Sequence, residues 1–239
     1  MSSSETPATW IDYWKTEDIY HDANWQINMD IFVKGTIPLL KYSSADVILD
    51  IGCGPGYFEA FAKDVVREVH GLDTSDRYLE ACRRRFQAVH NLFFYKLDEA
   101  NYTDLSFLQP KRFSKIICLS VVQYYSDVGK VERLIEQVRQ LALPGAHFLI
   151  ADIPVNSGLA PDLWGTFIVG VREAGFAETL KLLMRAQSSA YHMTRSTKGL
   201  LVIPLAELNA MIRRLNLKAE VLSTRMSTNE NRRHLLITF

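Results

Sequence analysis

The chain has 239 residues, 48% of them hydrophobic, which is enough to fill the core of one large α/β domain. Its 27 basic and 27 acidic residues cancel, which argues against an extensive surface for nucleic acid or anionic membrane. No apolar run approaches membrane-spanning length and no signal-peptide pattern begins the chain, so we expect no membrane association and a cytoplasmic location.

The three cysteines are Cys53, Cys82 and Cys118. They form no C-x-x-C pair and no metal-ligand spacing. We therefore expect free thiols in a reducing compartment and no metal site.

The N-terminal part of the chain is polar over residues 1–8 and then strongly aromatic. We expect disorder in residues 1–8. The aromatic segment predicts either a helix packed on the domain or a lid over a ligand, and residues 27–41 predict a second helix that Pro38 ends or kinks. The aromatic residues of the segment are Trp10, Tyr13, Trp14, Tyr20 and Trp25.

A buried strand followed by a glycine loop is the central feature of the sequence. Val47 to Leu49 is a continuous apolar run, typical of a parallel strand covered by helices on both faces. Asp50 follows, and then the glycines Gly52, Gly54 and Gly56, which allow a tight turn and a close approach of the backbone to a ligand. The next residues have the spacing of an amphipathic helix.

The spacing of the loop favours one ligand class over another. The dinucleotide fingerprint is G-x-G-x-x-G, whereas this loop is G-x-G-x-G, and Tyr57 occupies the third dinucleotide position. The carboxylate of Asp50 at the strand end suits a ligand that carries a cation, such as an ammonium or a sulfonium. Both features favour S-adenosyl-L-methionine over NAD.

The stretch D-I-G-C-G-P-G resembles motif I of the class I S-adenosylmethionine-dependent methyltransferases. The resemblance implies a Rossmann-like, doubly wound α/β fold with a seven-stranded, mostly parallel sheet and an antiparallel C-terminal strand. It also implies S-adenosyl-L-methionine as the cofactor, held by the loop residues Gly52, Cys53, Gly54 and Gly56. An N-terminal lid of this family would bring Tyr13 and Trp14 to the cofactor.

Two further acidic positions follow predicted strands. The strand 68–73 ends at Asp73, 17 residues after Gly56, near the spacing of an acid that binds ribose hydroxyls. The alternative is that Asp73 only caps the next helix, although Thr74 could cap it equally well. Thr74 is itself a further cofactor-binding candidate. The strand 92–97 is followed by Asp98 and Glu99, where the family has an acid that binds the adenine amino group. We favour Asp98.

The fourth strand, 116–119, opens into Ser120 and a pair of tyrosines, Tyr124 and Tyr125. The resemblance places this strand end beside the transferred methyl group, so Ser120 is a cofactor-binding candidate and both tyrosines are site candidates. The alternative is that the tyrosines pack under the next helix, 131–141. A turn at Pro144 and Gly145 and a fifth strand, 147–151, ending at Asp152, then follow.

The segment 154–203 is too long for a simple connection, so we expect a helical cap over an acceptor pocket. A helix at 204–216 and strands at 219–224 and 234–239 resemble the end of the methyltransferase sheet. Cap residues that could orient an acceptor, each more commonly a surface residue, are Arg172, Arg185, Tyr191, His192 and Arg195.

The sequence therefore predicts one methyltransferase domain with four parts: lid helices at 1–41, a cofactor-binding core at 45–152, the cap at 154–203, and the C-terminal helix and hairpin at 204–239. We expect methyl transfer to an oxygen or nitrogen atom of a small-molecule acceptor, by a monomer or homodimer.

Candidates for a general base are Tyr124, Tyr125 and His192. The alternative function is a non-catalytic, methyltransferase-like subunit that binds cofactor or a partner. Ser120 to Gln123 replaces the N/D-P-P-Y-type tetrapeptide, which argues against nucleic-acid bases as acceptors.

Overall fold

The computed structural model describes residues 7, 9–16, 23–156 and 190–239. Within them, seven strands form one sheet in the order β3-β2-β1-β4-β5-β7-β6. Strand β7 pairs antiparallel with both β5 and β6, and the other described neighbours are parallel. The strands are β1 (Val47–Ile51), β2 (Glu68–Asp73), β3 (Leu92–Lys96), β4 (Phe113–Leu119), β5 (Ala142–Ile153), β6 (Lys218–Leu222) and β7 (Arg233–Thr238).

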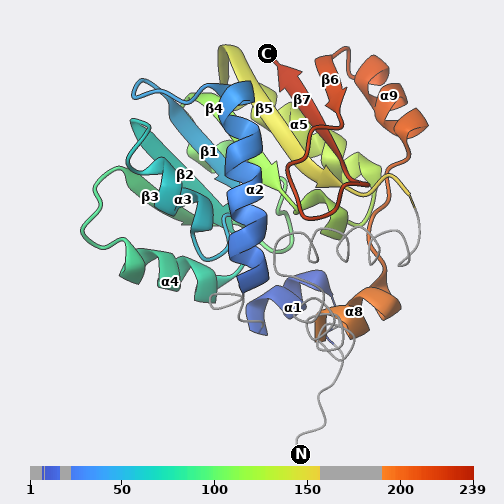
Figure 1. The fold of residues 1–239 in the computed structure, drawn as a ribbon, viewed down its shortest axis with the longest axis horizontal. Coiled ribbons are helices and arrows are strands. Elements are labelled where there is room, and N and C mark those ends of the chain that lie inside the picture. The colour runs from blue at the N-terminus through green and yellow to red at the C-terminus, as the bar shows by residue number, and fades with distance from the viewer. Residues whose placement is uncertain (1–6, 8, 17–22, 157–189) are drawn as a thin grey trace, which may run out of the picture.

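Helices cover both faces of the sheet (Figure 1). One face packs on α2, α3 and α4, through Phe32, Phe58 and Cys82 against Ile48 of β1. The other face packs on α5 and α9. The helices are α1 (Trp10–Thr16), α2 (Ala23–Leu40), α3 (Tyr57–Ala62), α4 (Asp76–Arg85), α5 (Val128–Leu141), α8 (Ala190–Lys198) and α9 (Leu205–Arg214), with 3-10 turns η1 (Ser106–Leu108) and η2 (Val122–Tyr124).

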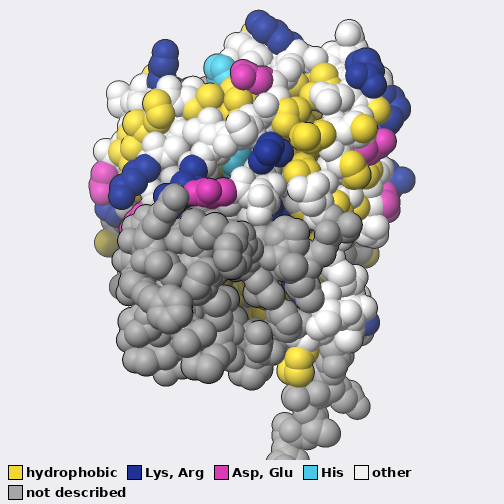
Figure 2. Space-filling model, turned by 45° about the vertical axis from the view of Figure 1, so that its right-hand side comes forward, with side chains coloured by type: hydrophobic (Ala, Val, Ile, Leu, Met, Phe, Trp, Pro, Cys, Tyr) yellow, Lys and Arg dark blue, Asp and Glu magenta, His cyan; other side chains and the backbone are white. Residues whose placement is uncertain are grey.

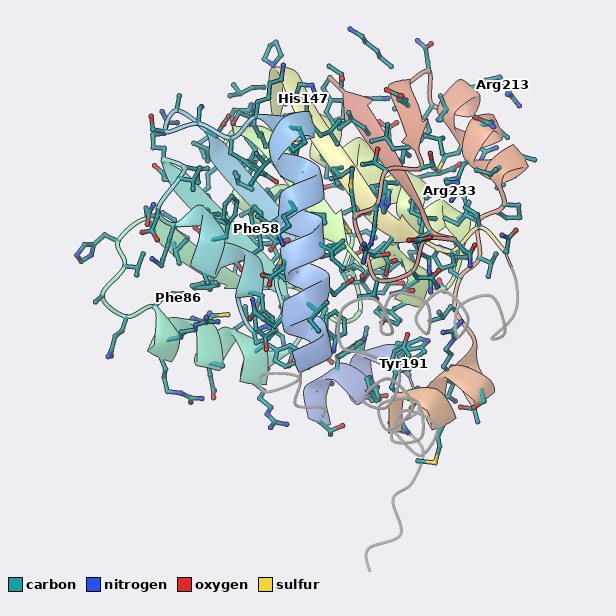
Figure 3. All side chains as sticks on the ribbon, in the orientation of Figure 1. Phe58, Phe86, His147, Tyr191, Arg213 and Arg233 are labelled. Carbon is teal, nitrogen blue, oxygen red and sulfur yellow. The ribbon has the colours of Figure 1, made fainter. Side chains whose placement is uncertain are left out.

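The composition of β1 fits a sheet that is covered by helices on both faces. All five residues of β1 are buried. A strand that is buried on both faces needs no alternation of polar and apolar residues. Phe58 of α3, labelled beside α2 in Figure 3, is 1% exposed and belongs to one buried cluster with Phe32 of α2 and Ile48 of β1. The central strands thus form a buried support whose carboxyl ends share one edge.

Most predicted elements agree with the structure, and the predicted α/β fold with its antiparallel seventh strand is confirmed. Strand β2 has the predicted bounds, whereas α2 begins at Ala23 rather than residue 27 and accommodates Pro38 near its end. The predicted turn at Pro144 and Gly145 is wrong, because β5 already begins at Ala142. A register shift against β4 absorbs these residues, and Gly145 bonds its N–H to Phe239 O.

The surface agrees with the balanced composition. On the face in Figure 2, basic and acidic side chains are interspersed among apolar ones. The described helices include none that is both long and apolar enough to cross a bilayer. In the same residues, no three His, Cys, Asp or Glu side chains gather as a metal site would require.

Candidate functional site

A cavity of about 590 Å³ opens at the carboxyl ends of β1, β2 and β4. The glycine loop and the strand ends form its floor, and residues of α1, α2 and the segment 198–202 complete its walls. Its apolar and aromatic lining includes Trp10, Trp14, Trp25, Met29, Phe32, Tyr78, Leu97, Tyr102, Tyr124 and Tyr125. The charged side chains among the described lining residues are Asp50, Asp73 and Lys198.

The backbone N–H groups of the glycine loop donate hydrogen bonds to acceptors within the protein. Gly52 and Cys53 both donate to Leu72 O, at 2.7 and 2.9 Å, and Gly56 donates to Cys53 O at 3.2 Å. Gly54 donates to Asp73 Oδ2 at 2.9 Å, and Pro55 has no N–H. A loop that cradles a pyrophosphate must offer free backbone donors. This loop offers none between residues 52 and 56, so the geometry disfavours a dinucleotide.

The three glycines are required for different reasons, although all have φ between 53° and 81°. A Cβ on Gly52 would lie 2.2 Å from Val121 Cγ2, and one on Gly56 would lie 2.7 Å from Phe86 Cε2. Around Gly54 no described atom lies within 4 Å of that position. Gly54 therefore presents bare backbone to the cavity, while Gly52 and Gly56 let the loop pack on its neighbours.

Asp50, at the end of β1, lines the cavity and is 4% exposed. Burial raises the pKa of its carboxyl to about 7; contact with the Glu59 carboxyl acts in the opposite direction, and the nearby charge of Asp73 adds to the increase. No ion pair joins Asp50 to a basic side chain within the described residues. A ligand ammonium would supply the missing opposite charge.

Asp73, at the end of β2, holds the loop and also lines the cavity. Its Oδ2 accepts from Gly54 N, and its Oδ1 accepts from Ser75 N at 2.8 Å. Burial raises the pKa of Asp73 to about 6, and these backbone donors oppose the increase. Each carboxylate oxygen can accept more than one hydrogen bond, so ribose hydroxyls remain compatible with this arrangement.

Helix α1 (Trp10–Thr16) packs with α8 (Ala190–Lys198) over the cavity, and we call this pair the roof. The indole of Trp10 donates a 2.9 Å hydrogen bond to Gly199 O, and its ring lies 4.7 Å from that of Tyr124 and 5.4 Å from that of Tyr191. Figure 3 shows Tyr191 at this contact between α1 and α8. The N-terminal aromatic segment therefore meets the end of the predicted cap over the strand ends.

The tyrosines after β4 line the cavity. Burial raises the pKa of Tyr124 and Tyr125 well above the usual phenol range. Both hydroxyls therefore keep their protons at neutral pH, which favours packing and orientation over proton abstraction. Ser120 also lines the cavity, and its hydroxyl donates to Asp152 Oδ2 at 2.7 Å.

Several predicted site residues lie elsewhere. Asp98 is exposed and accepts from Ala100 N, and Glu99 pairs with Lys15 and Lys96, so neither acid is part of the described cavity lining. Gly56 packs against α4 instead, and Tyr13 packs behind the wall on Trp10, Trp14 and Tyr191. Arg172, Arg185 and the side chain of His192 lie outside the described residues.

The predicted site residues that do meet at the cavity are Asp50, Gly52, Cys53, Gly54, Asp73, Thr74, Ser120, Trp14, Tyr124 and Tyr125. The sequence reasoning did not identify Glu59, whose carboxyl contacts Asp50 and is completely buried. The signal was its helical position beside Phe58 and three residues before Ala62, on the inward face of α3.

Comparisons with known proteins match parts of this chain to a domain family and to a much longer protein. Residues 48–145 match the family model described as a methyltransferase domain. Chondramide synthase cmdD of Chondromyces crocatus is 27% identical over 159 residues, which cover 64% of this chain. The match spans only 4% of that much longer protein.

Solved structures share the fold at low identity. The DhpI–SAH complex has a TM-score of 0.60 at 15% identity, covering 99% of this chain and 97% of that one. The N-methyltransferase NodS of Bradyrhizobium japonicum, in complex with S-adenosyl-L-homocysteine, has a TM-score of 0.57 at 13% identity and 98% coverage of both chains.

Proposed function

Since this chain has the domain and the fold of the class I S-adenosyl-L-methionine-dependent methyltransferases, we propose that it methylates a nucleophilic oxygen or nitrogen atom of a small-molecule acceptor. The observation that carries the proposal is the combination of a glycine loop without free N–H donors and a buried carboxylate, Asp50, without a basic partner in the described chain. That combination suits a cofactor with a cationic amino-acid group rather than a pyrophosphate.

The residues present fit S-adenosyl-L-methionine. Asp50 would hold the ammonium, Asp73 the ribose hydroxyls, and the bare backbone at Gly54 would allow close approach. Leu97 offers an apolar surface beyond β3. When bound, this cofactor supplies an electrophilic methyl group on a sulfonium. The leaving group is the demethylated cofactor, a neutral thioether, which needs no proton.

The chain's task is then to orient the acceptor and exclude water. The rings of Trp10, Trp14 and Tyr124 converge over the strand ends, with Trp14 and Tyr124 5.3 Å apart between centroids. Large aromatic side chains cover apolar ligands without adding charge. We infer an acceptor with a flat apolar body. Lys198 is the single basic residue of the described lining, and it is exposed, so the described lining offers no buried basic side chain for an anionic acceptor.

The acceptor must also be nucleophilic without help from Tyr124 or Tyr125, whose raised pKa values keep both protonated. An aromatic or secondary amine that is unprotonated at neutral pH meets this requirement. A phenol meets it when its own pKa is low enough to supply phenolate.

Calorimetry with S-adenosylhomocysteine and with NAD tests the cofactor. Binding of the first and none of the second is expected; the reverse would overturn the assignment. Transfer of labelled methyl from S-adenosyl-L-methionine to a panel of planar amines and phenols then tests the activity, with phosphorylated analogues as the comparison. Tight S-adenosylhomocysteine binding without turnover on any acceptor would favour the non-catalytic alternative.

A further inference from the structure

Glu59 is a completely buried acid at a position where an ionised carboxylate would be costly. It lies in α3 with 0% exposure, above Gly71 of β2. A Cβ on Gly71 would lie 2.8 Å from Glu59 Oε1, so the glycine leaves the space that this carboxyl fills. Neither side-chain oxygen receives a hydrogen bond from a donor in the described chain. A buried carboxyl with no donor is stable only in its protonated form.

The neighbour of Glu59 that can accept its proton is Asp50. The Glu59 carboxyl acts directly on Asp50 and lowers its pKa against the effect of burial, and Asp50 is the member that lines the cavity. Two neighbouring buried carboxyls cannot both be ionised at low cost, so they share a proton.

The groups around the pair are themselves acidic or neutral. Tyr42 follows α2, Cys53 lies in the glycine loop, Asp73 ends β2, Cys118 belongs to β4 and Cys82 to α4. Within the described residues, no Lys, Arg or His side chain acts on either carboxyl. The protein therefore leaves the negative charge of the pair to be balanced by whatever enters the cavity.

We propose that Glu59 is a positioning residue for the ammonium subsite: its protonated carboxyl donates to Asp50, so the pair presents one oriented negative charge to the cofactor's amino group. This inference rests on the proposed cofactor. It assigns Glu59 no contact with the cofactor; its effect is exerted through Asp50.

The shared proton makes cofactor binding depend on pH. Burial raises the pKa of Asp50 to about 7, and burial together with the charge of Asp50 raises that of Glu59 well above its usual range. At pH 7 the pair therefore lies between one and two bound protons. An ammonium beside Asp50 favours the ionised form, so binding releases about half a proton at pH 7 and almost none above about pH 8.5.

Calorimetry of S-adenosylhomocysteine binding in buffers of different ionisation enthalpy measures this release. Glu59→Gln keeps a neutral donor to Asp50, so affinity should stay within about threefold of wild type and proton release should be unchanged. Glu59→Leu removes the donor, so affinity at pH 8.5 should fall at least about tenfold and proton release should move to higher pH. Asp50→Asn should abolish the release.

Infrared difference spectra of the free protein provide the readout that is independent of cofactor. At pH 8.5 a carbonyl band of a protonated carboxyl should be present in wild type and absent in Glu59→Gln. No such band, or loss of proton release in Glu59→Gln, would overturn the shared proton even if Glu59→Leu does not fold. A band in a protein that binds no S-adenosylhomocysteine would overturn the cofactor assignment and the ammonium subsite with it, but not the protonated Glu59.

Discussion

The carboxylate of Asp73 accepts a 2.9 Å hydrogen bond from the N–H of Gly54, so β2 fixes the glycine loop that follows β1. Its other oxygen accepts from Ser75 N, whereas the Ser75 side chain makes no cap bond to α4. Asp73 thus connects two loops at the edge of the cavity. A substitution there should affect both the loop and the ligand.

Asp73→Ala should weaken S-adenosylhomocysteine binding by about 2–4 kcal/mol, because two charge-assisted bonds to ribose are lost. It should also reduce the free energy of unfolding by about 1–2 kcal/mol, because two backbone donors lose their acceptor. Calorimetry and urea denaturation measure the two effects. Asp98→Asn is the matched control: Asp98 is exposed, and among the described residues its carboxylate bonds only within its own turn, to Ala100 N. A loss of stability with unchanged affinity would reduce Asp73 to a structural role.

Gly52→Ala should destabilise the fold by roughly 2–4 kcal/mol, from a Cβ 2.2 Å from Val121 Cγ2 added to the strain of φ +80°. Gly145 has the same φ and no described atom within 4 Å of its Cβ position, so Gly145→Ala should cost only about 1 kcal/mol. Val121→Ala in the Gly52→Ala background should restore at least about 1 kcal/mol. Equal losses for the two glycine variants would contradict the contact with Val121.

The pH dependence of the free energy of unfolding should report the raised pKa of Asp50. Its pKa is near 4 when unfolded and about 7 when folded, so the native state binds more protons between these values. The contribution of Asp50 to stability should therefore fall as pH rises from about 4 to about 7 and then level off, while the raised pKa of Glu59 makes its own contribution fall further at higher pH. Asp50→Asn should remove up to about 4 kcal/mol of that fall, whereas the exposed Asp64→Asn should not. Denaturation with urea across this pH range is the measurement; parallel profiles for wild type and Asp50→Asn would contradict the buried carboxylate.

The sequence was sufficient for those parts of the site that local pattern determines. Asp50 and Asp73 directly end apolar strands, so their place at the shared edge follows from the parallel sheet. Asp98 follows its strand in the same way, yet the chain turns there and directs its carboxylate to Ala100 N. Glu59 was missed because a charged residue on a short helix is normally solvated. Gly71 belongs to β2, and the absence of a side chain there leaves the space in which Glu59 is buried.

The contact of Trp10 with Gly199 predicts the behaviour of the roof. The bond joins α1 to the segment after α8, and both line the cavity, so the two should become more ordered together when cofactor binds. Hydrogen exchange should show greater protection of residues 10–16 and 190–202 with S-adenosylhomocysteine. Trp10→Phe should lower the free energy of opening of α1 by about 1 kcal/mol, because one hydrogen bond is lost.

Trp14→Phe is the matched control for that variant, since Trp14 Nε1 is buried without a hydrogen-bond partner in the described chain. This control replaces an indole in the same wall by a smaller ring and removes no hydrogen bond. The hydrogen-exchange protection of residues 190–202 should therefore stay near that of wild type. Deleting residues 1–16 should then impair turnover and leave a folded core, because the sheet and its two helical layers do not depend on α1. If exchange in both segments ignores the ligand and the truncated protein keeps full activity, the aromatic residues only pack on the outside of the domain.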